Sequence, residues 1–450
     1  MSEGIRKLSI IKRGLILFLL LGTSIMNGLA DPTPVARIFR FGSGITSANV
    51  YRVEPDTLYS RKTGYGFEPG ADLHESKKGN ECAVVSSRPF LFSVKLPEGN
   101  YNVEVTLGDP NGQSSTTVKA EDRRLMLKQV VTGEGEIVTR EFTVNVRTPF
   151  IAGGGEVHLK PRELGPPLAL DWDNKLTLEF NGSHPCVDAV TITPAPHSVT
   201  LYLLGDSTVT DQPDEPWSSW GQMLPRFLKP GLAVANNAAS GETLESSLHA
   251  GRLAKVLSMM RSGDYLFIQY GHNDQKEHGP GVGAYTTYAA DLKYYIAETR
   301  LKGGHPVLIT SMNRRFFDHQ GKIVNTLGDY PAAVRLVASE EHVPLIDLNA
   351  MSETLFNVLG PEGTLKAFVH YPPNTFPNQP KALSDNSHFA PYGAYELAKC
   401  IVQGMTDAKI PITRFLKNPE FHFDPAKPDP FNSIYIPTSP ATSEVKPEGS

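Results

Sequence analysis

The sequence predicts an α/β protein whose parallel sheet is preceded by an all-β region. Between residues 199 and 348, apolar runs of strand length alternate with helix-length segments. From about residue 35 to residue 193, short segments alternate apolar and polar residues and are separated by turn sequences. Strands that alternate with helices are typical of βαβ units, in which helices cover both faces of a parallel sheet. The chain of 450 residues is longer than a single hydrophobic core usually supports, so we expect two domains.

Residues 1–30 have the pattern of an export signal. Basic residues precede the apolar run 14–26, and Gly28 and Ala30 stand at small-residue positions ahead of Asp31. The alternative is an uncleaved N-terminal anchor, but the apolar run is shorter than the roughly 20 residues that span a bilayer. We therefore expect a cleaved signal peptide and a secreted or periplasmic protein, without stable membrane insertion after cleavage.

Residues 35–193 predict an all-β sandwich or jelly roll. They contain segments of period-2 alternation and no convincing helix. Turn sequences at 97–100 and 109–112 separate or end these segments. The predicted strands are 90–96, 101–107, 141–146 and 175–180.

The predicted α/β domain follows a short linker and covers residues 198–415. Its predicted strands are 199–204, 265–270, 306–310 and 343–348, and its predicted helices are 245–260, 285–302, 330–341 and 391–401. After this domain, residues 424–450 are rich in Pro and Ser and contain few large apolar residues. This composition favours a position on the surface or a disordered tail.

Composition and charge argue against several functions. Hydrophobic residues at 40% and charged residues at 20% are typical of a soluble globular protein. The net charge of −5 argues against a nucleic-acid partner, and an acidic polysaccharide would have to be held by local Arg or Lys side chains. The sequence contains neither a CxxC pair nor an HExxH motif, so it gives little support to a metal site. Cys82 and Cys186 either form a disulfide or are small buried apolar residues, and the oligomeric state stays open.

The α/β region carries the residue types that nucleophilic acyl transfer needs. This chemistry requires a hydroxyl, a base, an acid that orients the base, and donors for the oxyanion. Ser207 follows the first strand, and Asp385 and His388 are three residues apart, a spacing that lets carboxylate and imidazole meet in a loop or single turn. Asn273 follows the second strand and can offer a side-chain N–H. Gly241 can offer an unobstructed backbone N–H.

These residues stand in four ordered blocks that resemble the SGNH, or GDSL-type, hydrolase superfamily. The blocks are Gly205-Asp206-Ser207, Gly241, Gly271-His272-Asn273-Asp274 and Asp385-Asn-Ser-His388. Residues 204–212 and 270–275 look more specifically like the rhamnogalacturonan acetylesterases. The resemblance covers about residues 198–410 and implies a three-layer α/β/α, flavodoxin-like hydrolase domain.

The resemblance also implies a role for each residue. Ser207 would be the nucleophile, His388 the general base and Asp385 the acid that orients it. The oxyanion hole would consist of the backbone N–H groups of Ser207 and Gly241 and the Asn273 side chain, and no metal or organic cofactor is implied. Family members often have arginine after the glycine where this chain has Glu242, which leaves the sugar preference open.

The N-terminal half has a resemblance of its own. Residues 39–42, Tyr59 and residues 64–67 resemble the galactose-binding-like sandwich found ahead of such esterases. Whether this sandwich binds carbohydrate or only packs against the hydrolase domain is left open by the sequence.

Other polar and aromatic residues near these blocks have structural interpretations. We expect Asp206 to stabilise the turn, and His272 and Asp274 to be structural or to neighbour the substrate. We expect Trp217 and Trp220, which follow the first block, to be packed in the protein interior; the alternative is that they form a platform for a sugar. For Arg314 and Arg315, contact with a uronate carboxylate and a solvated loop are equally open.

The sequence thus predicts an exported serine esterase that removes O-acetyl groups from plant cell-wall polysaccharide, with rhamnogalacturonan as the first candidate. One alternative is an esterase for acetylated xylan, a bacterial glycan or a short-chain lipid ester. Another is a polysaccharide-binding protein on an inactive esterase scaffold.

Overall fold

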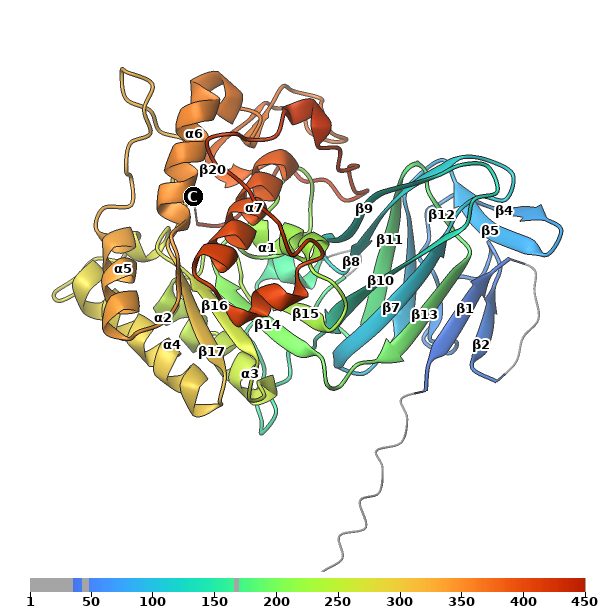
Figure 1. Cartoon of the computed structure of the whole chain (residues 1–450), viewed down its shortest axis with the longest axis horizontal. Helices are drawn as coiled ribbons and strands as arrows, with labels where there is room; N and C mark the ends of the chain where they lie inside the picture. The colour runs from blue at the N-terminus through green and yellow to red at the C-terminus, as the bar shows by residue number, and fades with distance from the viewer. Residues whose placement is uncertain (1–34, 43–47, 166–169, 450) are drawn as a thin grey trace, which may run out of the picture. The chain divides into compact units, whose positions relative to one another are not determined.

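The computed structural model describes residues 35–42, 48–165 and 170–449 (Figure 1). The signal peptide that we expect over residues 1–30 lies outside the described residues. Within the described part, an antiparallel β-rich region is followed by a parallel sheet with helices on both faces, which confirms the predicted fold class.

Two five-stranded sheets pack face to face in the first half of the chain (Figure 1). Their strands are β1 Arg37–Phe41, β2 Val50–Val53, β3 Tyr65–Phe67, β6 Phe90–Lys95, β7 Gly99–Leu107, β8 Ser114–Ala120, β9 Arg124–Thr132, β10 Val138–Val146, β11 Lys175–His184 and β13 Ala189–Pro194. One sheet has the order β10-β7-β13-β1-β2 and the other β3-β6-β11-β8-β9. Alternate residues such as Phe39, Val105, Phe92 and Leu178 fill the core between the sheets, as period-2 patterning requires.

A third, small sheet lies at the edge of this sandwich, and it contains β12 Cys186–Val187, β5 Glu81–Ser86 and β4 Leu73–Lys78. The described residues contain no disulfide, and Cys186, like Cys82 and Cys400, is buried. The Cys186 sulfur accepts a hydrogen bond from Gly108 N at 3.1 Å. The structure therefore favours the interpretation of Cys82 and Cys186 as small buried residues.

The second half is built on a parallel sheet with strand order β15-β14-β16-β17-β18. The strands are β14 Val199–Gly205, β15 Leu232–Asn236, β16 Tyr265–Gln269, β17 His305–Ile309 and β18 Leu345–Ile346. In chain order this is 2-1-3-4-5, the flavodoxin-like arrangement. Both faces are apolar, because Leu203 contacts one core and its neighbours Tyr202 and Leu204 contact the other.

Helices cover the two faces of this sheet (Figure 1). They are α1 Trp220–Met223, α2 Leu244–His249, α3 Arg252–Met259, α4 Ala289–Leu301, α5 Tyr330–Glu340, α6 Leu348–Thr364 and α7 Pro391–Asp407. Residues of α2 to α5 pack on one face, and residues of α1, α6 and α7 pack on the other. The single helix that we predicted over 245–260 is divided into α2 and α3, because Gly251 adopts a left-handed conformation with φ of 78°.

Shorter elements complete the described chain. The 3-10 helices are η1 Pro161–Leu164, η2 Leu224–Phe227, η3 Asp274–Lys276, η5 Pro411–Phe415 and η6 Phe431–Ser433. The element η4 Ala284–Tyr288 is a short π-helix. A two-stranded sheet pairs β19 Phe368–Tyr371 with β20 Leu383–Phe389.

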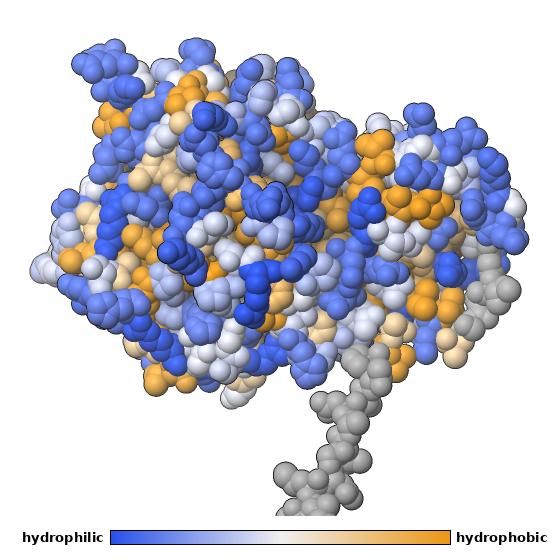
Figure 2. All heavy atoms as spheres, in the orientation of Figure 1, coloured by the Kyte–Doolittle hydropathy of each residue, from blue (hydrophilic) through white to orange (hydrophobic). Residues whose placement is uncertain are grey.

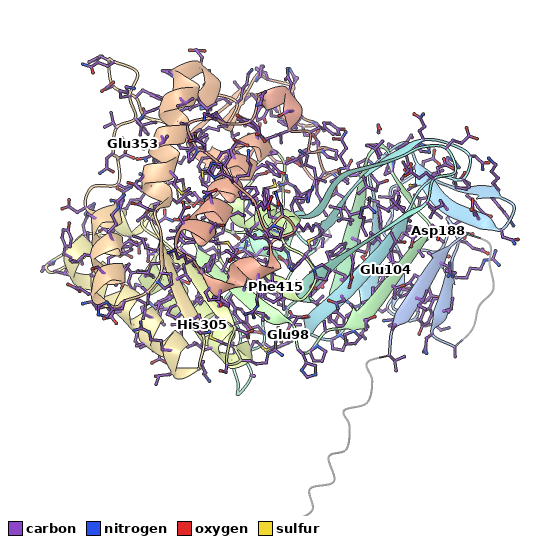
Figure 3. All side chains as sticks on the ribbon, viewed as in Figure 1. Glu98, Glu104, Asp188, His305, Glu353 and Phe415 are labelled. Atoms are coloured by element: carbon purple, nitrogen blue, oxygen red, sulfur yellow. The ribbon has the colours of Figure 1, made fainter. Side chains whose placement is uncertain are left out.

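Buried ion pairs join the β-sandwich to the α/β region. Arg124 on β9 contacts Asp211 at 3.1 Å and Asp171 at 3.0 Å, and it donates to the carbonyl of Val234 on β15 at 3.1 Å. Burial raises the pKa of Asp211 to about 7 despite the nearby guanidinium of Arg124. At a second junction Glu98, labelled in Figure 3, accepts a 2.5 Å hydrogen bond from Lys255 on α3. Breaking a buried pair on one side costs about 3–5 kcal/mol, so these contacts hold the two regions together.

The Pro- and Ser-rich stretch, residues 424–449 of the described chain, runs over the surface and makes defined contacts. From its composition we expected either a surface position or a disordered tail. Ser439 is buried, and its hydroxyl lies between Lys119 Nζ at 2.6 Å and Glu179 Oε1 at 2.9 Å, both on the β-sandwich. Asn181 donates to the carbonyl of Thr438 at 2.8 Å. These polar anchors act together with Ile434 and Ile436, which pack against the core of the α/β region.

The visible surface in Figure 2 is mainly hydrophilic, with apolar residues scattered over it. Among the helices that the structure describes, none combines the length and apolar character needed to cross a membrane.

Candidate active site

The candidate site lies where three neighbouring strands of the parallel sheet end. Because β14 lies between β15 and β16, the segments that leave these strands meet at the point where the strand order reverses. Open α/β sheets bind their ligands at this switch point, outside the carboxyl ends of the strands. Ser207 follows β14, Gly241 follows β15 and Asn273 follows β16.

The turn that carries Ser207 is fixed by its neighbours. Gly205 has no room for a side chain, since a Cβ there would lie 2.5 Å from the Val209 side chain and 2.7 Å from the carbonyl of Gln269. The Asp206 carboxylate accepts hydrogen bonds from Thr208 N at 2.9 Å and Thr208 Oγ1 at 2.7 Å. These are the turn contacts that we expected of Asp206.

Ser207, His388 and Asp385 lie in one row of hydrogen bonds. His388 Nε2 is 2.8 Å from Ser207 Oγ, and His388 Nδ1 is 2.9 Å from Asp385 Oδ2. An ionised carboxylate only accepts hydrogen bonds, so Nδ1 carries the proton and Nε2 is free to accept from the serine hydroxyl. Each of the three residues is only 2% exposed.

Asp385 and His388 lie on strand β20, and our prediction of a loop or single turn there was wrong. In a regular strand, residues three apart point to opposite faces. The register between β19 and β20 shifts along this stretch, where Ser384 pairs with His370 and Phe389 pairs with Phe368. Asp385 Oδ1 also accepts from the backbone N–H groups of Ser387 at 2.6 Å and His388 at 2.9 Å. This local irregularity turns the carboxylate and the imidazole toward each other.

The surroundings keep Asp385 ionised and His388 neutral. Burial acts to raise the pKa of Asp385, but hydrogen bonds from the His388 side chain and backbone outweigh it and hold that pKa well below its usual range. Burial lowers the pKa of His388, against the opposing effect of Asp385. The ammonium group of Lys446 lowers the pKa of His388 further. A neutral imidazole beside a hydroxyl has the protonation state of a general base.

Gly241 and Asn273 lie next to each other beside this row. Gly241 has a φ of 77°, a conformation that side chains other than glycine's rarely adopt. Asn273 Nδ2 donates to the carbonyl of Glu242 at 3.0 Å, and Asn273 Oδ1 accepts from Lys276 Nζ at 3.2 Å. These two contacts fix the orientation of the amide and leave it one further N–H to donate.

Glu242, which departs from the family pattern, is buried and held by cations. Its carboxylate is 3.0 Å from Lys160 Nζ and 3.8 Å from Arg252 Nε, and it accepts a short hydrogen bond from Ser246 Oγ. Lys160 also donates to the carbonyl of Ser240 at 2.5 Å. Sequence reasoning missed Lys160, because it belongs to the connection between β10 and β11 and no local pattern links it to the α/β region.

A second Asp–His pair lies behind the serine turn. His272 Nδ1 is 3.2 Å from Asp206 Oδ2, and His272 Nε2 is 3.0 Å from the carbonyl of Met312. Burial acts to raise the pKa of Asp206, but His272 and Thr208 lower it below its usual value. Burial raises the pKa of Asp274 to about 8, and its carboxyl group accepts from Gly271 N at 2.8 Å.

The remaining residues that we singled out are held by packing or by hydrogen bonds to the backbone and to other side chains. Trp217 and Trp220 are buried, and Trp220 Nε1 donates to Gln269 Oε1 at 2.8 Å. Arg314 is mostly buried and donates to the carbonyl of His272 at 2.9 Å. Arg315 donates to the carbonyl of Pro361 at 2.8 Å. In the described parts of the chain, no group of three or more His, Cys, Asp or Glu residues is arranged to hold a metal ion.

Comparisons with known proteins match the α/β region to esterases. Residues 203–371 match the GDSL-like lipase/acylhydrolase family. The chain is 40% identical over 224 residues to rhamnogalacturonan acetylesterase RhgT of Bacillus subtilis (strain 168), covering 49% of this chain and 96% of that protein. It is 36% identical over 216 residues to the probable rhamnogalacturonan acetylesterase YesY of the same organism, covering 47% and 95%.

A longer match is found among solved structures. The crystal structure of the YxiM protein from Bacillus subtilis aligns with 84% of this chain and 99% of its own, at 26% identity and a TM-score of 0.44.

By the sequence matches, the protein is a carboxylic ester hydrolase. It belongs to the GDSL-like lipase/acylhydrolase family.

Proposed function

We propose that this protein is a serine esterase that removes O-acetyl groups from plant cell-wall polysaccharide, in particular from rhamnogalacturonan. The observation that carries the proposal is the row of hydrogen bonds from Ser207 through His388 to Asp385, beside Gly241 and Asn273. The acetyl group and the polymer are inferred from the two rhamnogalacturonan acetylesterase relatives.

In the proposed reaction Ser207 Oγ attacks the acetyl carbonyl while His388 Nε2 takes the hydroxyl proton. The tetrahedral intermediate collapses, the sugar oxygen leaves with the proton from His388, and the acetyl group remains on Ser207. Water then loses a proton to His388 and attacks the acetyl-enzyme, which releases acetate and restores the serine. Asp385 keeps the proton on Nδ1 and stabilises the imidazolium that forms in each step.

The oxyanion would be held by the backbone N–H groups of Ser207 and Gly241 and by the remaining N–H of Asn273. Donors that are oriented before the reaction stabilise developing charge without having to reorganise. The hydrogen bonds of Asn273 to Glu242 and Lys276 provide this orientation.

A cationic cavity beside the row supports an acidic polymer as substrate. The cavity has a volume of about 450 Å³, and its lining includes Lys276, Arg314 and Ser387. Lys276 and Arg314 belong to the α/β region, the third cationic lining residue, Lys446, lies near the end of the described chain, and none of the described lining residues is acidic. In a protein with a net charge of −5, such a local cationic site is what a polyuronate would require, whereas neutral xylan would not.

The proposal includes the domain organisation and export that the sequence predicts. A signal peptide over residues 1–30 would direct the protein out of the cytoplasm, where the polysaccharide is found. The galactose-binding-like sandwich over residues 35–193 would precede the hydrolase domain over residues 198–415, with the Pro- and Ser-rich tail after it.

The test is acetate release by residues 31–450 from acetylated rhamnogalacturonan, acetylated xylan and p-nitrophenyl esters of increasing chain length, with Ser207→Ala as the control. We expect serine-dependent release from rhamnogalacturonan to exceed release from xylan. Faster release from xylan would contradict the substrate, and activity confined to longer acyl esters would indicate a lipid-type esterase. Absence of any serine-dependent release would contradict the reaction and leave a binding function.

A further inference from the structure

Residues 441–449, which we call the covering segment, lie directly over the candidate site. The segment first pairs with the backbone of Glu215, which donates to the carbonyl of Ala441 at 2.9 Å and accepts from Ser443 N at 2.9 Å. Trp217 Nε1 then donates to the carbonyl of Ser443 at 3.0 Å. The ring of Trp217 also stands edge-on to the imidazole of His388, with 5.8 Å between the centroids. The segment therefore approaches the reacting residues along the loop that follows Ser207.

Charged side chains hold the middle of the covering segment. Arg162 donates to the carbonyl of Val445 at 3.1 Å. Lys446 Nζ is 3.2 Å from Asp385 Oδ2, the same oxygen that His388 contacts. The covering segment thus reaches the row of hydrogen bonds itself.

The end of the covering segment fills the space between the two oxyanion candidates. A methyl group on Gly449 would lie 2.6 Å from Asn273 Oδ1, 2.9 Å from Asn273 Nδ2 and 2.9 Å from Gly241 Cα. The carbonyl of Gly449 accepts from Lys276 Nζ at 2.7 Å, and Glu448 Oε2 is 3.4 Å from Lys160 Nζ. An acyl group could not enter this space while Gly449 is there, because even one added carbon atom overlaps the side chain of Asn273.

The two ends of this stretch are held very differently. Upstream, Ser439 is 3% exposed and lies between buried charged groups of the β-sandwich. Downstream, the side chains of Lys446 and Glu448 are 47% and 53% exposed. In each of these ion pairs one partner is about half exposed, while the other, Asp385 or Lys160, is 1% or 25% exposed. Such half-open pairs hold the segment less firmly than the buried contacts of Ser439 hold the upstream end, so the downstream part can open locally while the upstream anchor stays in place.

We propose that the covering segment is a tethered occupant of the acyl-binding site, and that it must leave before an ester can reach Ser207. Its contacts also define the walls of that binding region, which include Lys160 and Arg162 from the β-sandwich half of the chain. This inference rests on the proposed function for what the segment blocks, but the contacts that carry it do not depend on the reaction.

The first test is a deletion of residues 442–450 that keeps Ser439 and the hydrogen bond to Ala441. We expect hydrolysis of p-nitrophenyl acetate to rise at least tenfold in kcat/KM, with an unchanged melting temperature. The matched point variants are Lys446→Ala, which loses the contact with Asp385, and Glu444→Ala as the control. Glu444 is exposed and makes no hydrogen bond or ion pair with the residues that the structure describes, so the control should behave as the full chain does.

The second test uses binding, independently of catalysis. A synthetic peptide with the sequence of residues 442–449 should bind the deletion variant and compete with p-nitrophenyl acetate. A short flexible tether supplies an effective concentration of about millimolar, so the peptide should be titrated up to several millimolar. Binding can be followed by the emission of Trp217, with the Trp217→Phe deletion variant as the blank.

The outcomes separate the inference from the proposed function. Unchanged hydrolysis after the deletion, together with absence of peptide binding, would overturn the inference. Lower hydrolysis in a fully folded deletion variant would also overturn it, because the segment would then complete the site. If no variant shows Ser207-dependent hydrolysis, the proposed function fails. In that case the inference would still be supported if the peptide binds the deletion variant and no longer binds when Lys276→Ala is added to it. Failure of the peptide to bind the deletion variant would overturn the inference.

Discussion

Two Asp–His pairs lie within the same site and differ in what the second ring nitrogen faces. His388 contacts Asp385 at 2.9 Å and His272 contacts Asp206 at 3.2 Å, and all four residues are buried. The other nitrogen of His388 faces the hydroxyl of Ser207, which can donate a proton. The other nitrogen of His272 faces the carbonyl of Met312, which can only accept one.

These partners decide which ring can act as a base. Both ring nitrogens of His272 face acceptors, so neither nitrogen is placed to take a proton from a hydroxyl. His388 makes both hydrogen bonds as a neutral ring. Burial and a carboxylate partner therefore do not by themselves identify a base, and the group at the second nitrogen does.

We expect the largest loss of activity when the hydrogen-bonded row of Ser207, His388 and Asp385 loses one of its reacting groups. We expect Ser207→Ala and His388→Ala each to lower kcat by about 10⁶-fold, since groups that act as one unit fail together. The measurement is acetate release under saturating substrate, with circular dichroism to show that the variants fold. More than about a tenth of the original activity in either variant would remove that residue from the mechanism.

A smaller effect is expected when only the orienting acid changes. Asp385→Asn should lower kcat by about 10⁴-fold, because an amide in this place allows the unproductive imidazole tautomer. The measurement is kcat at a pH above the His388 transition, where the ring is neutral. A loss below about tenfold would mean that another group orients His388.

The second pair should respond in stability and not in catalysis. We expect His272→Gln to lower the free energy of unfolding by about 1–3 kcal/mol, because it leaves the buried carboxylate of Asp206 with a weaker partner. The loss in kcat should stay below about tenfold. Urea unfolding and kcat measured on the same samples would test this, and a 10³-fold loss of kcat in a stably folded variant would place His272 in the reaction.

The sequence placed Ser207 and Asn273 at one edge of the sheet, because each follows a predicted strand and parallel strands end at one edge. The strand before Gly241, β15, was not predicted, and Gly241 was found only through the family resemblance. The spacing of Asp385 and His388 also predicted their contact. The strand that carries them was missed, because the register shift against β19 depends on residues far away in the sequence. Their catalytic roles stay predictions until the variants above are measured.

The contacts of the last residues could not be predicted from sequence for a different reason. A stretch rich in Pro and Ser indicates only that it cannot build a core of its own. Its anchors include single polar groups, such as Ser439 between Lys119 and Glu179, and no periodic pattern marks them. The pairing of Lys160 with Glu242 could not be predicted for the same reason, since the two residues lie in different halves of the chain.

The smallest expected effect concerns how Lys446 influences the pair that contacts Ser207. The charged groups that act on His388 are Asp385 and Asp206, which raise its pKa, and Lys446, which lowers it together with burial. Lys446→Ala removes a lowering contribution, so the pKa of His388 should rise. Because the neutral ring is the active form, the acid limb of the kcat/KM profile should move to higher pH. Glu444→Ala should leave that limb in place, and an acid limb that stays fixed in both variants would show that Lys446 does not act on His388 in solution.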